Sequence, residues 1–163
     1  MTSRTDSPII NRGRQLTLAM VIVIIDQFSK AIIAEQLGDG RTVTAIPGLL
    51  ELHLVHNTGA AFSLLSNATP WLGLLSLLVA AGLSRWIWRR PQQPLWQGLA
   101  VSFLLGGTLG NGLDRWRLGY VVDFLALVPI NFPVFNPADI AINLAVACFA
   151  IDLLQQPRKP DHG

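Results

Sequence analysis

Charged residues are scarce in this sequence. Asp, Glu, Lys and Arg together make up only 13% of the 163 residues, whereas an ordinary soluble domain has about 25%. Apolar residues make up 51%, and the mean hydropathy is +0.45. The composition therefore predicts a membrane protein. The net charge of +2 is too small to indicate nucleic acid as a partner.

Cysteine is nearly absent too. The single Cys148 excludes an internal disulfide and any metal site built from several cysteines. His53 and His56 are three apart on a predicted strand, so their side chains point to opposite faces and are not expected to share a metal. Internal repeats and low-complexity tracts are also missing, which favours a single domain over residues 1–163.

Four long hydrophobic segments dominate the chain, at residues 15–37, 70–88, 95–113 and 137–154. A membrane-spanning helix needs about 20 mostly apolar residues, and all four are close to that length. None alternates apolar and polar residues as a barrel strand does. The sequence therefore predicts an integral membrane protein that is mainly α-helical, with four transmembrane helices. The first segment carries internal charges and no small-residue cleavage site follows it, so we expect a retained helix.

Basic residues are distributed unevenly between the two predicted sides of the membrane. Eight of the 12 Lys and Arg residues fall on the side of the two termini, including a cluster at Arg85, Arg89 and Arg90. Because cytoplasmic segments are enriched in Lys and Arg, both termini are expected in the cytoplasm. The long loops 38–69 and 114–136 then face outward, and residues 91–94 form a plain short turn on the inside.

The first outer loop has strand character. Residues 50–54 (LELHL) alternate strictly between apolar and polar, which is typical of a half-buried strand. We therefore expect a small extracytoplasmic β-sheet within residues 41–65. In the third hydrophobic segment, Gly106 and Gly110 have the G-x-x-x-G spacing that allows helices to approach closely.

Ionisable residues in or beside membrane segments usually mark function, because their burial is costly. Asp26 and Lys30 are four residues apart on one helix face and can pair. The pair either neutralises itself and simply tolerates burial, or it orders a polar site nearby.

Asp123 and Asp139 are the two other notable carboxylates. Asp123 lies in the apolar run 121–125 (VVDFL), where partial desolvation favours its protonated form. Asp139 follows Asn136 and Pro137, a good N-cap and a good first helical residue, so it occupies the first turn of a helix. The alternatives are a loop aspartate turned to water and a plain capping aspartate. Two neighbouring carboxylates that share a proton are the catalytic group of aspartic proteases.

Five ordered blocks resemble the lipoprotein signal peptidase family, also called signal peptidase II. The blocks are residues 26–30 (DQFSK), 57–62 (NTGAAF), 106–115 (GGTLGNGLDR), 121–124 (VVDF) and 135–140 (FNPADI). The resemblance extends over nearly the whole chain, about residues 15–155, and rests on these blocks in this order.

The resemblance implies an aspartic endopeptidase of the bacterial plasma membrane. It would cut the signal peptide from prolipoproteins just before a cysteine that carries a diacylglyceryl group. Asp123 and Asp139 match the family's catalytic aspartates, and Asp114 adjoins the site without being catalytic. The supporting polar residues of the family fall on Asp26, Lys30, Asn57, Gly59, Asn111, Arg115 and Asn136. No metal or organic cofactor is expected, the partners are lipid-modified prolipoproteins and membrane lipids, and the protein is expected to be a monomer.

Two other functions fit the same composition. A small ion or proton transporter could use Asp26, Asp123 and Asp139 as a relay, although Asp123 and Asp139 are predicted near one membrane boundary. A non-catalytic assembly protein could use its G-x-x-x-G face to recruit helices, and would tolerate loss of both aspartates.

Overall fold

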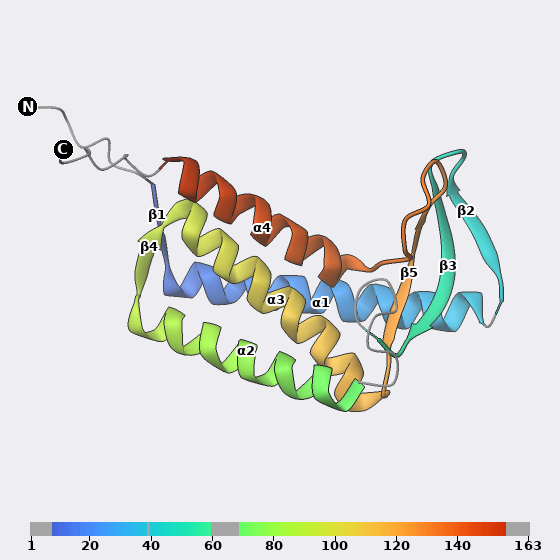
Figure 1. Cartoon of the computed structure of the whole chain (residues 1–163), viewed down its shortest axis with the longest axis horizontal. Coiled ribbons are helices and arrows are strands. Elements are labelled where there is room, and N and C mark those ends of the chain that lie inside the picture. The colour runs from blue at the N-terminus through green and yellow to red at the C-terminus, as the bar shows by residue number, and fades with distance from the viewer. Residues whose placement is uncertain (1–7, 39, 60–68, 156–163) are drawn as a thin grey trace, which may run out of the picture.

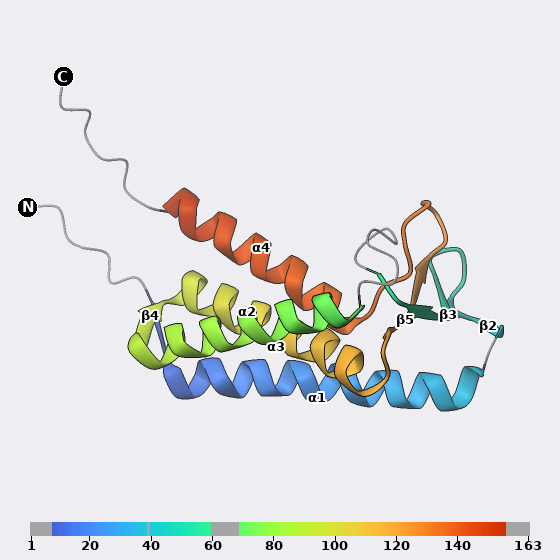
Figure 2. The same ribbon diagram turned by 60° about the horizontal axis from the view of Figure 1, so that its bottom comes forward.

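Four helices run along the long axis of the molecule in the computed structural model, which describes residues 8–38, 40–59 and 69–155. They are α1 (Arg12–Leu37), α2 (Thr69–Arg89), α3 (Leu95–Arg117) and α4 (Pro137–Gln155). A sheet of three strands lies at one end of the helices, and a pair of short strands lies at the other (Figures 1 and 2). All four helices coincide with the predicted hydrophobic segments, with ends that differ by at most a few residues.

α3 is the central helix and packs against α1, α2 and α4. Glycines make this possible. A Cβ atom at Gly107 would lie 2.6 Å from the carbonyl oxygen of Ala138 in α4, and one at Gly106 would lie 3.0 Å from that of Ala19 in α1. No larger residue fits at the first of these distances without a shift of the backbone. The close helix approach predicted from the glycine spacing is therefore confirmed.

The spanning character of the four helices differs. α1, α2 and α4 are long and apolar enough to cross a membrane, whereas α3 does not qualify among the helices that the structure describes. Its sequence includes several glycines, Ser102, Thr108, Asn111 and Asp114, which are buried against the protein rather than exposed. The prediction of four transmembrane helices is thus supported by apolarity for three of them.

The larger sheet is antiparallel, with the order β2 (Thr42–Ile46), β3 (Leu50–Asn57) and β5 (Val121–Leu127). β2 and β3 lie within the region 41–65 where a sheet was predicted; residues 60–65 lie outside the described residues. β5 comes from the second outer loop and was not predicted as a strand. The half-buried strand predicted from residues 50–54 is confirmed, because these residues lie in β3, all five are partly buried, and Leu52 and Leu54 pack against a buried cluster that includes Phe124.

The opposite end of the molecule corrects another prediction. Residues 91–94 are not a plain turn, because β4 (Gln92–Pro94) pairs in antiparallel fashion with β1 (Ile9–Asn11). Gln93 is buried and donates from Nε2 to Oε1 of Gln15 over 3.0 Å. This contact ties the start of α1 to the connection between α2 and α3.

Candidate active site

Asp123 and Asp139 lie where the sheet meets the helices. Asp123 is on β5, and Asp139 is in the first turn of α4. The chain between them doubles back, so that Phe135 N donates to the carbonyl oxygen of Leu125 over 3.0 Å, and Leu125 N donates to that of Phe135 over 2.8 Å. This return places the start of α4 beside β5 (Figure 1), and Asn136 bonds to Val122 and Asp123 of that strand.

Asn136 touches both aspartates. Its side-chain Nδ2 donates to Asp123 Oδ1 over 2.6 Å, and its backbone N donates to Asp139 Oδ2 over 3.2 Å. Asp139 N in turn donates to Asn136 Oδ1 over 2.9 Å. This reciprocal pattern is a capping box, and it confirms Asn136 as the N-cap of α4. The two carboxylates are thereby held on the two sides of one buried asparagine.

A second asparagine holds each carboxylate from another element. Asn57, in the last position of β3, donates from Nδ2 to Asp123 Oδ2 over 2.9 Å. Asn111 of α3 donates from Nδ2 to Asp139 Oδ1 over 2.8 Å. Both oxygens of each carboxylate therefore have a donor, and the donors come from three different parts of the chain.

Burial changes the acidity of Asp123. Its side chain is almost completely enclosed, and this desolvation, with a smaller contribution from the negative charge of Asp139, raises the pKa of Asp123 from 3.8 to about 6. The hydrogen bonds from Asn57 and Asn136 act in the opposite direction. The sequence-based expectation of a desolvated Asp123 is confirmed, and Asp139 is near enough to influence its titration.

Lys30 is the centre of a buried ionic cluster next to the aspartate pair. Its Nζ is 2.8 Å from Asp26 Oδ2 and 2.9 Å from Asp114 Oδ2, and it donates to Asn111 Oδ1 over 3.0 Å. The predicted pairing of Asp26 with Lys30 is confirmed. The pair does more than neutralise itself, because Lys30 also orients Asn111, which holds Asp139.

Both carboxylates of this cluster also bind backbone amides. Asp26 Oδ1 accepts from Ala138 N over 3.0 Å, and Asp114 Oδ2 accepts from Val122 N over 3.1 Å. Val122 precedes Asp123, and Ala138 precedes Asp139. Each of the two buried carboxylates thus fixes the backbone immediately before one of the candidate catalytic aspartates.

Gln27 is a residue of this site that the sequence reasoning did not select. Its Nε2 donates to Asp114 Oδ1 over 2.8 Å and to the carbonyl oxygen of Gly110 over 3.1 Å. The role of Asp114 as the second partner of Lys30 was also not foreseen. The position of Gln27 between Asp26 and Lys30 in the block 26–30 was a signal that could have pointed to it.

Arg115 and Gly59 meet at the edge of the site. Arg115 Nη2 donates to the carbonyl oxygen of Gly59 over 3.2 Å, and Gly59 N donates to Asn57 Oδ1 over 2.9 Å. Arg115 Nε is buried and lacks a hydrogen-bond acceptor among the described residues. The structure therefore brings together all nine residues singled out for the site.

Metal ligands are not grouped in the part of the chain that the structure describes, where no three His, Cys, Asp or Glu side chains are placed to share an ion. His53 contacts Thr42 Oγ1 at 3.1 Å, and the ring of His56 lies 4.2 Å from that of Tyr120. The acidic side chains of the site are instead occupied by amide donors and by Lys30.

Known proteins are similar to this chain in both sequence and fold. The family model described as signal peptidase (SPase) II matches residues 18–155. The lipoprotein signal peptidase of Parasynechococcus marenigrum (strain WH8102) is 60% identical over 155 residues, covering 95% of this chain and 98% of that protein. The lipoprotein signal peptidase of Pseudomonas aeruginosa PAO1 is 35% identical, with coverage of 91% and 93%.

A solved structure supports the same relationship. A bacterial membrane enzyme determined by the in meso method at 2.3 Å resolution superposes with a TM-score of 0.84 at 31% identity, covering 93% of each chain. Because the family model spans most of the chain and the similarity extends over nearly the full length of these relatives, the chain belongs to the signal peptidase II family of membrane peptidases.

Proposed function

We propose that this protein is an aspartic endopeptidase that removes the signal peptide from diacylglyceryl-modified bacterial prolipoproteins, cutting just before the lipidated cysteine. The observation that carries the proposal is the pair Asp123 and Asp139, which are held on either side of the buried Asn136. The relatives named lipoprotein signal peptidase support the substrate class.

The chemistry uses one proton shared by two carboxylates. Asp139, ionised, takes a proton from a water molecule as the water oxygen attacks the carbonyl carbon of the scissile bond. Asp123, protonated, donates a hydrogen bond to the carbonyl oxygen, where negative charge develops. The proton that Asp139 took from the water then passes to the leaving nitrogen as the C–N bond breaks, which returns Asp139 to its ionised form. The raised pKa of Asp123, caused by its burial, supports its role as the protonated member.

The supporting residues divide into two groups by what they contact. The first group, Asn57, Asn111 and Asn136, donates hydrogen bonds to the two catalytic carboxylates. Lys30, paired with Asp26, orients Asn111. Arg115 and Gly59 border the space in which the peptide would lie. The free Nε–H of Arg115 is suited to a peptide carbonyl oxygen. No metal or organic cofactor takes part in this mechanism.

The proposed membrane arrangement has four spans in the bacterial plasma membrane, with both termini in the cytoplasm and the aspartates at the outer face. α3 can cross the membrane in spite of its polar residues, because the other three helices surround it and those residues face protein. The lipid anchor of the substrate would stay in the bilayer while the peptide reaches the aspartates. The active unit is a monomer.

Replacement of each aspartate by asparagine tests the proposal. Asp123→Asn and Asp139→Asn keep the shape of the side chain but remove the carboxylate, so cleavage of a lipidated prolipoprotein by the purified protein in detergent should fall by more than about a hundredfold. Glu35→Gln, a matched change at an exposed position of α1, should leave cleavage unchanged.

Two further arms of the experiment separate the alternatives. An unlipidated substrate should be cut poorly, and a metal chelator should have no effect. Retained cleavage by Asp139→Asn would exclude the aspartate pair as the catalytic group. Ion flux through the protein in liposomes without substrate would instead favour a transporter.

A further inference from the structure

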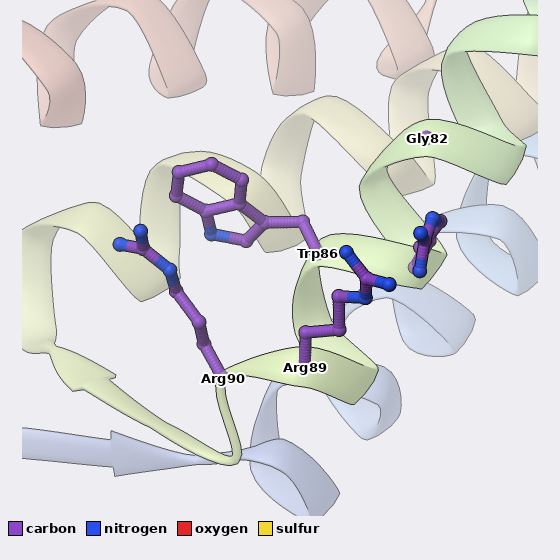
Figure 3. A pocket seen from close by; sticks show the side chains of 5 residues that line it. Gly82, Trp86, Arg89 and Arg90 are labelled. Atoms are coloured by element: carbon purple, nitrogen blue, oxygen red, sulfur yellow. The ribbon is translucent and has the colours of Figure 1, made fainter.

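A hollow lined by arginine lies near the C-terminal end of α2. This end of α2 is at the opposite end of the bundle from β5 and the start of α4, which carry the two aspartates (Figure 1). It has a volume of about 310 Å³ and is lined by Gly82, Arg85, Trp86, Arg89 and Arg90 (Figure 3). None of the nine residues of the candidate active site lines it. We call it the arginine hollow.

The arginine hollow carries positive charge that no carboxylate of the described residues neutralises. Within the described residues, the only ion pairs are those of Lys30, so Arg85, Arg89 and Arg90 have no carboxylate partner there. Each guanidinium presents planar N–H donors that match the oxygen atoms of a phosphate group. Three of them around one hollow favour an anionic ligand.

Trp86 gives the arginine hollow a fixed wall. Its Nε1 donates to Gln93 Oε1 over 3.1 Å, and Gln93 is itself buried and bonded to Gln15. The guanidinium of Arg90 lies over the indole ring, 4.2 Å from its centroid. The indole is therefore anchored from β4, and one of the three arginines is held against it.

Gly82 keeps the arginine hollow open. A Cβ atom at this position would have no atom within 4 Å, so the space beside the helix backbone is free. The glycine is not needed for helix packing at this point, in contrast to Gly106 and Gly107 of α3. Its small size leaves room for a ligand between the arginines.

An exposed apolar stripe leads along α2 to the arginine hollow. Trp71, Leu75 and Leu78 precede Gly82 at steps of four, three and four residues, which places them on one face of the helix. They are 73%, 54% and 61% exposed. A soluble anion would make no use of this stripe, whereas a phospholipid has a phosphate group for the arginines and an acyl chain for the leucines.

We propose that the arginine hollow binds the headgroup of an anionic phospholipid, with an acyl chain lying along Leu78, Leu75 and Trp71. The inference rests on the membrane location of the family and not on the catalytic mechanism. In the proposed orientation the hollow faces the inner leaflet, the side on which basic residues meet anionic lipid.

Native mass spectrometry of the full-length protein in detergent can test this site, with phosphatidylglycerol and phosphatidylcholine as competing probes. The wild type should retain phosphatidylglycerol preferentially. Gly82→Leu fills the hollow without changing any charge, and Arg85→Gln with Arg89→Gln removes two of its donors. Each should weaken phosphatidylglycerol binding by about tenfold or more.

Arg14→Gln is the matched control, because Arg14 is exposed at the start of α1 but does not line the hollow. It should keep the wild-type preference. Prolipoprotein cleavage should persist in all of these variants, which separates failure of this site from failure of the proposed peptidase activity.

Three results would overturn the proposal. The first is equal retention of both lipids by the wild type, and the second is undiminished phosphatidylglycerol binding by Gly82→Leu. The third is displacement of the lipid by millimolar inorganic phosphate, which would make a free phosphate, and not a lipid, the ligand.

Discussion

Asn136 shows how one side chain can organise a site by using all of its hydrogen-bonding atoms. Its Nδ2 reaches Asp123 and its Oδ1 caps α4 at Asp139. It is completely buried, so none of these bonds competes with water at its surface. A buried amide with partners on both ends is stabilising, whereas an unpaired one is costly. The geometry of the aspartate pair therefore depends on a residue that carries no charge.

Lys30 organises the charged side chains of the site in the same way. It lies between the carboxylates of Asp26 and Asp114, with all three side chains buried. A buried ion pair is weak evidence for stability, because the desolvation of both partners opposes their attraction. Its more important consequence here is positional, since the two carboxylates also bind the amides of Ala138 and Val122.

The titration of Asp123 predicts how stability depends on pH. Its pKa is 3.8 in an exposed setting and about 6 in the native protein, because burial disfavours the charged form. Between these values the native state binds more protons than the unfolded state, so the free energy of unfolding falls as pH rises. Asp123→Asn removes this contribution.

Thermal unfolding in detergent between about pH 4 and pH 7 would measure the effect. The melting temperature of the wild type, relative to that of Asp123→Asn, should decrease as pH rises through this window and then level off. Two curves that run parallel throughout would contradict the assignment of the raised pKa to Asp123.

At the scale of elements, the packing of α3 against α4 determines where Asp139 lies. Gly107 faces the backbone of Ala138, the residue before Asp139. In Gly107→Ala the added methyl group would lie 2.6 Å from the carbonyl oxygen of Ala138, so α4 must shift. We expect prolipoprotein cleavage to fall at least about tenfold, since small displacements of catalytic groups have large effects on rate.

Gly82→Ala is the control for this substitution. Its added methyl group meets no atom within 4 Å, and alanine favours a helix over glycine by about 1 kcal/mol. Cleavage and thermal stability should therefore be maintained or improved. If Gly107→Ala behaves in the same way as Gly82→Ala, the close approach of α3 and α4 is not what positions Asp139.

β5 contributes the other half of the pair by a different route. Its register with β3 pairs Asp123 with Val55, and the bond between Asp114 and Val122 N holds the strand to α3. Asp139 is thus positioned by helix packing, and Asp123 by strand pairing and one buried carboxylate. The two depend on Asn136 to bring them together.

At the scale of the whole molecule, the proposed topology predicts which ends of the bundle are accessible from each side of the membrane. In a Cys148→Ala background, Thr44→Cys on the exposed β2 strand should react with a membrane-impermeant maleimide outside the cell. Gln92→Cys, exposed at the opposite end, should react only after the membrane is opened. Labelling of Gln92→Cys in intact cells would contradict the proposed topology and indicate the opposite orientation in the membrane.

Sequence patterns predicted the helices well, because the long apolar segments leave few alternatives to a helix in a membrane. They also predicted Asn136 as the N-cap of α4 and the pairing of Asp26 with Lys30, because both depend on residues that are close in the sequence. β5 was missed because it is a strand completed by a distant partner. The pairing of β1 with β4 was also missed. Each strand has only three residues, and its partner is distant in the sequence.

By itself, the sequence determined the helical segments, the local pairs and, through its five motif blocks, the family. Only the tertiary structure decided that Asp114 shares Lys30 with Asp26 and that Gln27 donates to the carboxylates of Asp26 and Asp114. It also decided that Asn136 contacts both Asp123 and Asp139. These contacts join residues up to 87 positions apart. Their formation depends on how closely α3 packs against its neighbours, and a linear pattern of residues does not contain that distance.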